Sequence, residues 1–242
     1  MSQRTVELPH AAALSPRGEL EEPVVAADML PTGTRTVELH VPPTAPTLEK
    51  YELLDAEERA LVATAVDRRK ADFGDSRWCA HQAMSSFGPD LPILRGRRGM
   101  PLFPDAITGS LTHTDGYRAA LVGSSTRWAS LGIDAEPATA LPDGVLEAIA
   151  RPAELRRLRR LRRGELGELM GKVLFSAKES TYKAWFPLTH RFLDFDEADI
   201  DIRADGTFTA HLLAQPQPVP FIEGRWIISG GFIATVTAVR RY

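Results

Sequence analysis

The order of helix-like and strand-like segments constrains the fold of this chain more than any other feature of its sequence. Helical patterning covers residues 55–87, with a break near Phe73-Gly74. Three short strand-like runs follow over 107–136, and we expect them to form an antiparallel meander. The second half repeats this order, with helices over 146–185 and strands over 198–239. We therefore predict an α+β protein with two similar lobes in a pseudo-dimeric arrangement, each a helix-containing antiparallel sheet.

Turn and capping signals set the expected boundaries. Asp55 and Glu58 have the spacing of a capping box, and Asp115-Gly116 is a hairpin signal. Residues 1–22 show little periodicity and are expected to form a mobile N-terminal tail, with folded structure beginning near Val24 and a strand over 34–41. We expect an N-terminal lobe over 23–131 and a C-terminal lobe over 132–242, with the active site at their junction.

Composition excludes several classes of protein. The chain has 242 residues, of which 43% are hydrophobic, and its longest apolar stretches are too short to cross a bilayer. The N-terminus has no secretory signal pattern, so a cytoplasmic location without membrane association is expected. The single cysteine, Cys79, rules out an intramolecular disulfide and fits a small buried side chain. A net charge of −3 gives no overall bias toward nucleic acid.

Two acidic residues alternate in the strand-like run Gly132-Ile133-Asp134-Ala135-Glu136. Because side chains alternate across a strand, Asp134 and Glu136 point the same way, and two converging carboxylates suit a hard cation such as magnesium. Taken alone, they are explained more simply as solvated acids at a strand end.

A helical segment about forty residues later changes that balance. Glu179 and Lys183 are four residues apart and share a helix face, and Lys178 precedes them. A surface ion pair would explain Glu179 and Lys183, but not the aromatic neighbours at Phe175, Tyr182 and Trp185. These aromatic residues indicate a helix packed against the core, where three charged side chains without a partner or a function would be unfavourable. A functional cluster is the better interpretation.

Candidate anion-binding residues lie upstream. His113 ends a strand-like run, where it is positioned to donate to a phosphate oxygen, although a lone histidine of this kind is more often structural. Arginines and glycines gather in two segments, 68–77 and 95–101, and guanidinium groups match phosphate geometry. The sequence has neither a P-loop nor a dinucleotide-binding glycine motif, which argues against ordinary NTPase or dinucleotide sites.

The chain resembles the 4′-phosphopantetheinyl transferase superfamily in four motifs that occur in order: Arg-Arg-Gly-Met-Pro at 97–101, Ser-Leu-Thr-His at 110–113, Gly-Ile-Asp-Ala-Glu at 132–136 and Phe-Ser-Ala-Lys-Glu-Ser-Thr-Tyr-Lys-Ala-Trp at 175–185. The last two are the main signatures of the family. The resemblance covers about residues 51–242 and is to the larger, two-lobed Sfp type, in particular to actinobacterial PptT-like enzymes. It implies transfer of phosphopantetheine from coenzyme A to a serine of an acyl or peptidyl carrier protein, with release of adenosine 3′,5′-bisphosphate.

The resemblance also implies roles for individual residues. Asp134, Glu136 and Glu179 fall on the magnesium ligands, with manganese as the alternative metal. Glu179 is the preferred general base, a metal-ordered water being the alternative, and Lys178 and Lys183 fall near the pyrophosphate and the catalytic centre. The implied coenzyme A contacts are Arg69, Arg77, Arg95, Arg98, Gly99, Met100, Pro101, Thr112, His113, Lys178 and Lys183.

Partners and rival functions follow from the same residues. Seven arginines lie over 151–163, where they form either a solvated helix face or a steering surface for an acidic carrier protein of fatty-acid, polyketide or nonribosomal-peptide synthesis. The pseudo-dimeric resemblance favours a monomer. A magnesium-dependent hydrolase of nucleotide pyrophosphates is the main rival, because it would use the same acids. A nonenzymatic polyanion-binding protein fits less well, since the basic segment lacks interleaved aromatic residues.

Overall fold

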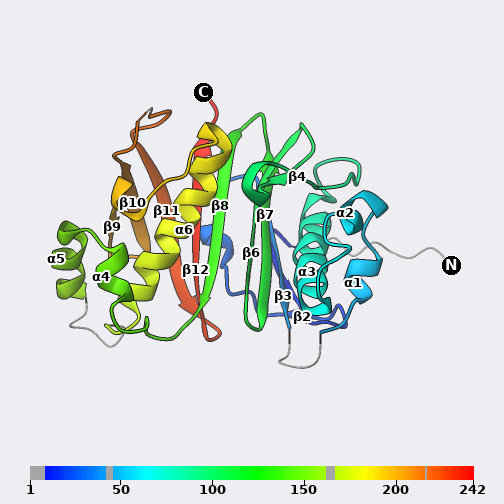
Figure 1. The fold of residues 1–242 in the computed structure, drawn as a ribbon, viewed down its shortest axis with the longest axis horizontal. Helices are drawn as coiled ribbons and strands as arrows, with labels where there is room; N and C mark the ends of the chain where they lie inside the picture. The colour runs from blue at the N-terminus through cyan, green and yellow to red at the C-terminus, as the bar shows by residue number, and fades with distance from the viewer. Residues whose placement is uncertain (1–8, 42–45, 162–166, 216) are drawn as a thin grey trace.

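Two five-stranded sheets form the framework of this computed structural model, which describes residues 9–41, 46–161, 167–215 and 217–242 (Figure 1). The first sheet has the order β2-β1-β3-β7-β6, and its strands are β1 (Ala11–Leu14), β2 (Leu20–Glu21), β3 (Thr34–His40), β6 (Ile107–Thr114) and β7 (Tyr117–Ser124). The second has the order β8-β12-β11-β10-β9, and its strands are β8 (Trp128–Pro137), β9 (Ala198–Ile202), β10 (Thr207–Leu212), β11 (Phe221–Ser229) and β12 (Phe232–Arg240). A short hairpin pairs β4 (Leu94–Arg95) with β5 (Pro101–Leu102).

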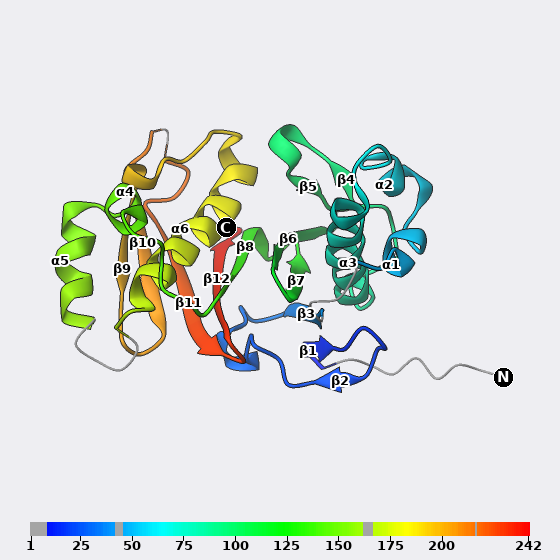
Figure 2. The same cartoon turned by 60° about the horizontal axis from the view of Figure 1, so that its bottom comes forward.

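One long helix packs on each sheet, as the two-lobe prediction requires. The N-terminal helices are α1 (Glu49–Glu52), α2 (Ala56–Ala60) and α3 (Asp67–Met84), and the C-terminal ones are α4 (Val145–Ile149), α5 (Pro152–Leu161) and α6 (Met170–Thr189). Cys79 and Met84 of α3 pack on β3 and β7 residues, and Trp185 of α6 packs in a larger core with β9 to β12. Figure 2 shows α3 and α6 on the same side of the two sheets. The α+β prediction is confirmed.

The two sheets meet edge to edge at β6 and β8. The sequence suggested that β8 continues the meander of β6 and β7, but β8 pairs with β12 instead, so that interpretation is wrong. Side-chain hydroxyls bridge the two edges: Oγ of Ser110 accepts from the backbone N–H of Ile133, and Oγ1 of Thr112 accepts from that of Ala135, both at 3.1 Å. The expected lobe boundary at 131/132 consequently falls inside a strand.

The expected N-terminal tail is corrected in part. Residues 1–8 lie outside the described residues, but β1 is buried and runs parallel to β3, with Ala12 opposite Val37. Folded structure therefore begins well before Val24. The prediction of a tail over residues 1–22 missed this strand because β1 is only four residues long and buried throughout, so its sequence shows no alternation that would reveal a strand.

The helical region of the N-terminal lobe also differs from expectation. It divides into α1, α2 and α3, and α3 runs without a break through Phe73-Gly74. Gly74 marks a close helix contact, since a Cβ there would lie 2.6 Å from the Cα of Tyr51. The N-cap Asp55 accepts from the backbone N–H of Glu57, but Glu58 does not complete a capping box because its side chain is buried elsewhere.

Among the described residues, none of the helices combines the length and the apolar character that a membrane span requires.

Candidate active site

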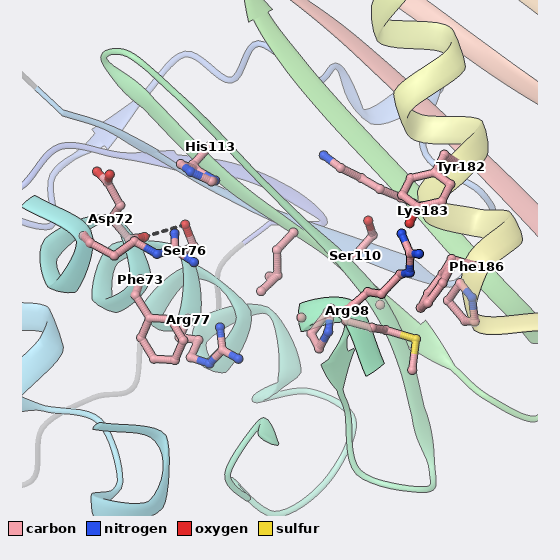
Figure 3. Close-up of a pocket in the computed structure, with 17 residues that line it drawn as sticks. Asp72, Phe73, Ser76, Arg77, Arg98, Ser110, His113, Tyr182, Lys183 and Phe186 are labelled. Carbon is pink, nitrogen blue, oxygen red and sulfur yellow. Dashed lines mark hydrogen bonds between the residues drawn. The ribbon is translucent and has the colours of Figure 1, made fainter. Parts of the chain in front are cut away.

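A cleft of about 290 Å³ opens between the lobes, close to the lower end of the volumes of small-ligand pockets (Figure 3). Four elements form its walls: α3, the tip of the β4–β5 hairpin, β6 and α6. The lining residues are Arg69, Asp72, Phe73, Ser76, Arg77, Arg98, Gly99, Met100, Pro101, Gly109, Ser110, Leu111, His113, Tyr182, Lys183, Phe186 and Pro187. Most of the residues expected to bind coenzyme A therefore share one cavity, although they come from distant parts of the chain.

Basic side chains from both lobes face this cleft. Arg69 and Arg77 come from α3, where a separation of eight residues places them on one helix face. Burial lowers the pKa of Arg77 to about 10, partly offset by Glu58, and the guanidinium lies 3.8 Å from the centre of the Phe73 ring. Arg98 has a φ of 53°, a left-handed conformation, at the tip of the hairpin. The arrangement favours an anionic ligand.

His113 lies near the end of β6, opposite α6 (Figure 3). Desolvation in the cleft lowers the pKa of its imidazole, and the nearby Arg118 guanidinium lowers it further. Arg118 is held by Asp72, to which it donates at 2.5 Å. His113 is therefore mainly neutral at pH 7 in the free protein and would gain charge beside a phosphate.

Three carboxylates approach one another beside this basic wall. Asp134 is buried in β8, where its Oδ1 accepts from Nζ of Lys183 at 2.8 Å and its Oδ2 has no hydrogen-bond partner among the described residues. Burial raises the pKa of Glu136 and of Glu179, and the negative charge of Asp134 raises both further. The sequence expectation that strand and helix bring these acids together is consistent with the effect of Asp134 on both glutamates.

Close packing of α6 against β8 and β12 sets that arrangement. A Cβ on Gly132 would lie 2.0 Å from the carbonyl oxygen of Ser180, so a larger residue cannot occupy this position without displacing α6. Oγ1 of Thr237 donates to the same carbonyl at 2.9 Å, and Oγ1 of Thr235 donates to the carbonyl of Ser176, also at 2.9 Å. These contacts fix the helix turn that carries Glu179.

The acidic cluster has the chemistry of a divalent-cation site. Among the described residues, no three His, Cys, Asp or Glu side chains are already arranged to hold a metal ion together. However, Asp134 has a buried carboxylate oxygen without a partner, and its charge raises the pKa of both Glu136 and Glu179, so a cation at this position would stabilise the ionised acids. Asp134, Glu136 and Glu179 therefore fit a magnesium ion by charge and ligand type.

Lys178 is not placed as the sequence suggested. Its Nζ donates to the carbonyls of Phe195 and Ala198 and pairs with the buried carboxylate of Glu154 at 2.9 Å. These acceptors all belong to the C-terminal lobe and lie outside the cleft lining. We therefore assign the Lys178 ammonium group a structural role, and the catalytic set reduces to Glu179 and Lys183.

Two other expected ligand contacts are corrected. Thr112 is buried, and its hydroxyl accepts from the backbone of Ala135 rather than facing the cavity. Arg95 is exposed and is absent from the described cleft lining, whereas its neighbours Arg98 to Pro101 line it. The alternation of a strand explains the first difference, because Thr112 and His113 must point to opposite faces.

Several residues of the site escaped sequence reasoning. Lys172 lies 3.6 Å from Glu136, seven residues before Glu179 on the same face of α6, so helix periodicity could have revealed it. Tyr182, Phe186 and Ser76 also line the cleft, although the aromatic pattern of α6 predicts only packing against the core and no pattern singles out Ser76. The rings of Tyr182 and Phe186 are 5.7 Å apart and form an apolar wall beside Lys183.

Comparison with known proteins identifies both lobes. Residues 57–123 match the 4′-phosphopantetheinyl transferase N-terminal domain, and residues 130–237 match the 4′-phosphopantetheinyl transferase superfamily. The chain is 42% identical over 227 residues to 4′-phosphopantetheinyl transferase Npt of Nocardia iowensis, covering 87% of this chain and 97% of that protein. It is 45% identical to 4′-phosphopantetheinyl transferase Svp of Streptomyces mobaraensis, covering 79% and 80%, and 42% identical to 4′-phosphopantetheinyl transferase PptT of Mycobacterium tuberculosis, covering 74% and 83%.

Proposed function

Because the chain belongs to the 4′-phosphopantetheinyl transferase superfamily, we propose that the cleft between its lobes binds coenzyme A and that its acidic cluster holds magnesium there. The protein is an enzyme that transfers the 4′-phosphopantetheine group of coenzyme A to a serine of a carrier protein and releases adenosine 3′,5′-bisphosphate. The observation that carries the proposal is the meeting of a basic cleft wall with a buried acid, Asp134, that leaves one oxygen without a partner.

Each wall of the cleft has a task in this reaction. Arg69, Arg77 and His113 would bind phosphate groups of coenzyme A, and the hairpin tip over 98–101 would contact the nucleotide. Lys183 would place its positive charge beside the pyrophosphate, because its Nζ already lies between the cleft and Asp134. Fixed charges of this kind stabilise a phosphoryl-transfer transition state without a protein nucleophile.

Glu179 would accept the proton of the carrier serine. Its carboxylate lies close enough to Asp134 and Lys183 for their charges to act on it, so it shares the site of the proposed metal and of the lysine beside the pyrophosphate. The serine oxygen attacks the phosphorus that bears the pantetheine arm, a new P–O bond forms, and the bond to adenosine 3′,5′-bisphosphate breaks. A magnesium or manganese ion held by Asp134, Glu136 and Glu179 would neutralise charge on the pyrophosphate.

Helix α5 is the proposed contact for the carrier. Arg156, Arg159 and Arg160 are exposed on it, whereas Arg157 is bound by Asp199 and lies 3.5 Å from Asp201. Arg151 donates to the backbone carbonyl of Asp196, and the last two arginines of the run, Arg162 and Arg163, lie outside the described residues. Reversing Arg156 and Arg160 to glutamate should raise the KM for the carrier, with a smaller effect at high salt; an unchanged KM at low salt would reject this surface.

The acceptors would be carrier proteins or carrier domains of fatty-acid, polyketide or nonribosomal-peptide synthesis, and we propose a cytoplasmic location for the enzyme. A monomer is proposed because both walls of the cleft come from one chain. Light scattering at assay concentration tests this proposal, and a stable dimer would contradict it.

One assay tests the activity and its rivals. The protein is incubated with coenzyme A, magnesium and an apo carrier protein, and the mass of the carrier is measured. We expect a gain of one phosphopantetheine group, at least about a hundredfold slower with Glu179→Gln. Cleavage of coenzyme A without modification of the carrier would instead identify a pyrophosphate hydrolase. Omitting magnesium should abolish the modification, and adding manganese measures the metal preference.

A further inference from the structure

A fully buried carboxylate, Glu58 of α2, lies behind the basic wall of the cleft. Its Oε1 accepts from the backbone N–H of Ile93 at 3.2 Å and lies 3.4 Å from Nε of Arg77. Its Oε2 lies 2.9 Å from Nε2 of His81. Glu58 is 0% exposed, so both carboxylate oxygens interact with groups of the protein and not with solvent.

Glu58 determines which nitrogens of Arg77 face the ligand. Nε of Arg77 lies beside Glu58 and donates to the carbonyl of Ile93 at 3.3 Å. The terminal nitrogens have no hydrogen-bond partner among the described residues, and Arg77 lines the cleft. The guanidinium group is therefore held from behind, with its two-nitrogen end available to an anion.

Ile93 connects this contact to a second wall of the cleft. Both of its backbone groups are held, the N–H by Glu58 and the carbonyl by Arg77, and its side chain is 0% exposed. The next residue begins β4, so Ile93 is the base of the hairpin whose tip, 98–101, lines the cavity. One carboxylate thus fixes both a phosphate-facing guanidinium and the hairpin beside it.

His81 and Asp90 form a pair that contacts the second carboxylate oxygen of Glu58. Nδ1 of His81 lies 2.5 Å from Oδ1 of Asp90, in the loop that leads to Ile93. Although burial opposes the charged form, the hydrogen bonds to Glu58 and Asp90 raise the pKa of His81. His81 therefore fixes Oε2 of Glu58, which leaves Oε1 beside Arg77 and the backbone of Ile93.

We infer that Glu58 is a positioning residue for the nucleotide end of coenzyme A, acting through Arg77 and the base of the β4–β5 hairpin. A buried ion pair contributes little net stability, since desolvation offsets most of its attraction. The ion pair instead preorganises one wall of the binding site, because the groups that contact the ligand are already held in place before it binds. This inference rests on the proposed function and adds a residue that does not touch the ligand.

The test compares Glu58→Gln with Glu57→Gln, the same change at the exposed neighbouring position. Adenosine 3′,5′-bisphosphate is titrated into each protein by calorimetry, without any reaction. We expect Glu58→Gln to weaken binding about tenfold and to raise the KM for coenzyme A similarly, with kcat within about twofold of wild type, because only binding geometry is lost. Glu57→Gln should match wild type. Equal affinities for the two variants, or a loss confined to kcat, would overturn the inference.

A double variant separates positioning from general destabilisation. If Glu58 acts through Arg77, the two substitutions should not be independent. The double variant Glu58→Gln, Arg77→Gln should then raise the dissociation constant by clearly less than the product of the two single fold-increases. A full product of the two effects would overturn action through Arg77. Circular dichroism at the titration temperature shows whether each variant is folded. If Glu58→Gln does not fold, His81→Asn provides a second variant, which leaves Glu58 and Arg77 intact and is also expected to weaken binding. Failure of wild type to bind the nucleotide would instead reject the proposed function.

Discussion

At His113, the cleft holds an imidazole whose pKa lies below its ordinary value because of desolvation and Arg118. A bound phosphate should raise this pKa, so coenzyme A binding takes up a proton when the pH lies between the two pKa values. Affinity should therefore increase as the pH falls through this window and level off below the pKa of the free protein. The gain is about tenfold for each unit by which the ligand raises the pKa.

The comparison of wild type with His113→Asn isolates this effect, because protonation of the coenzyme A phosphates changes the affinity of both proteins equally. The dissociation constant of His113→Asn divided by that of wild type, measured from pH 5 to pH 8, should grow as the pH falls. A ratio that stays constant with pH would contradict a titrating contact between His113 and the ligand.

Sequence reasoning succeeded at single residues where one periodicity decided the geometry. Strand alternation placed Asp134 and Glu136 together, and helix spacing placed Glu179 and Lys183 on one face. The same periodicity explains why Lys178 was assigned wrongly: it is one residue, and so about 100° around the helix, from Glu179. Its amine turns toward Glu154, a residue that no local pattern connects to it.

Between helices, the Glu154–Lys178 pair joins α5 to α6. Glu154 also accepts from the backbone N–H of Ile200 at 2.7 Å, which connects both helices to β9. Glu154→Gln should lower the free energy of unfolding by about 3 kcal/mol, because it leaves a buried ammonium group without its countercharge. Chemical denaturation measures this loss. Coenzyme A affinity, measured under conditions where the variant is folded, should be nearly unchanged, since the pair lies outside the cleft.

The double variant Glu154→Leu, Lys178→Met provides the control. Removing both charges should recover part of the stability, because their desolvation cost disappears, although the backbone N–H groups of Ile200 and Arg151 lose their acceptor. If the double variant bound coenzyme A at least about tenfold more weakly than wild type while it was folded, Lys178 would contact the ligand after all.

At the scale of elements, the sequence predicted where helices and strands occur better than how strands pair. Strands β9 to β12 and the long helix α6 lie close to their expected positions, since alternation and turn residues define them locally. The partner of β8 is β12, about a hundred residues later, and no local signal specifies that pairing. The parallel partner of β1 is likewise set by burial rather than by a turn.

The whole molecule is held together by a core that belongs to neither lobe alone. Val24 and Val25 pack with residues of β7, β8 and β12, including Leu131 and Val236. The segment that carries these valines lies between β2 and β3, and its continuation passes beside β11 and β12 (Figure 2). The cleft geometry therefore depends on how this segment is anchored.

Glu38 of β3 provides that anchor, since its two carboxylate oxygens accept from the backbone N–H groups of Val24 and Val25 at 2.8 and 3.0 Å. Burial raises the pKa of Glu38 to about 7 from an ordinary value of 4.5, despite the opposing effect of these hydrogen bonds. The folded protein thus binds a proton that the unfolded chain releases above pH 4.5. Its free energy of unfolding should fall, by at most about 3 kcal/mol, as the pH rises from 4.5 to 7.

Glu38→Gln removes this titration and should flatten the stability curve between pH 4.5 and pH 7, relative to the matched change Glu22→Gln at an exposed position of the same segment. Denaturant unfolding at several pH values measures both curves. Because Glu38 anchors the core between the lobes, both lobes should show the change, and hydrogen exchange in β6 and in α6 should shift together. A shift confined to the N-terminal lobe, or parallel pH curves for the two variants, would mean that Glu38 does not couple the lobes through its proton.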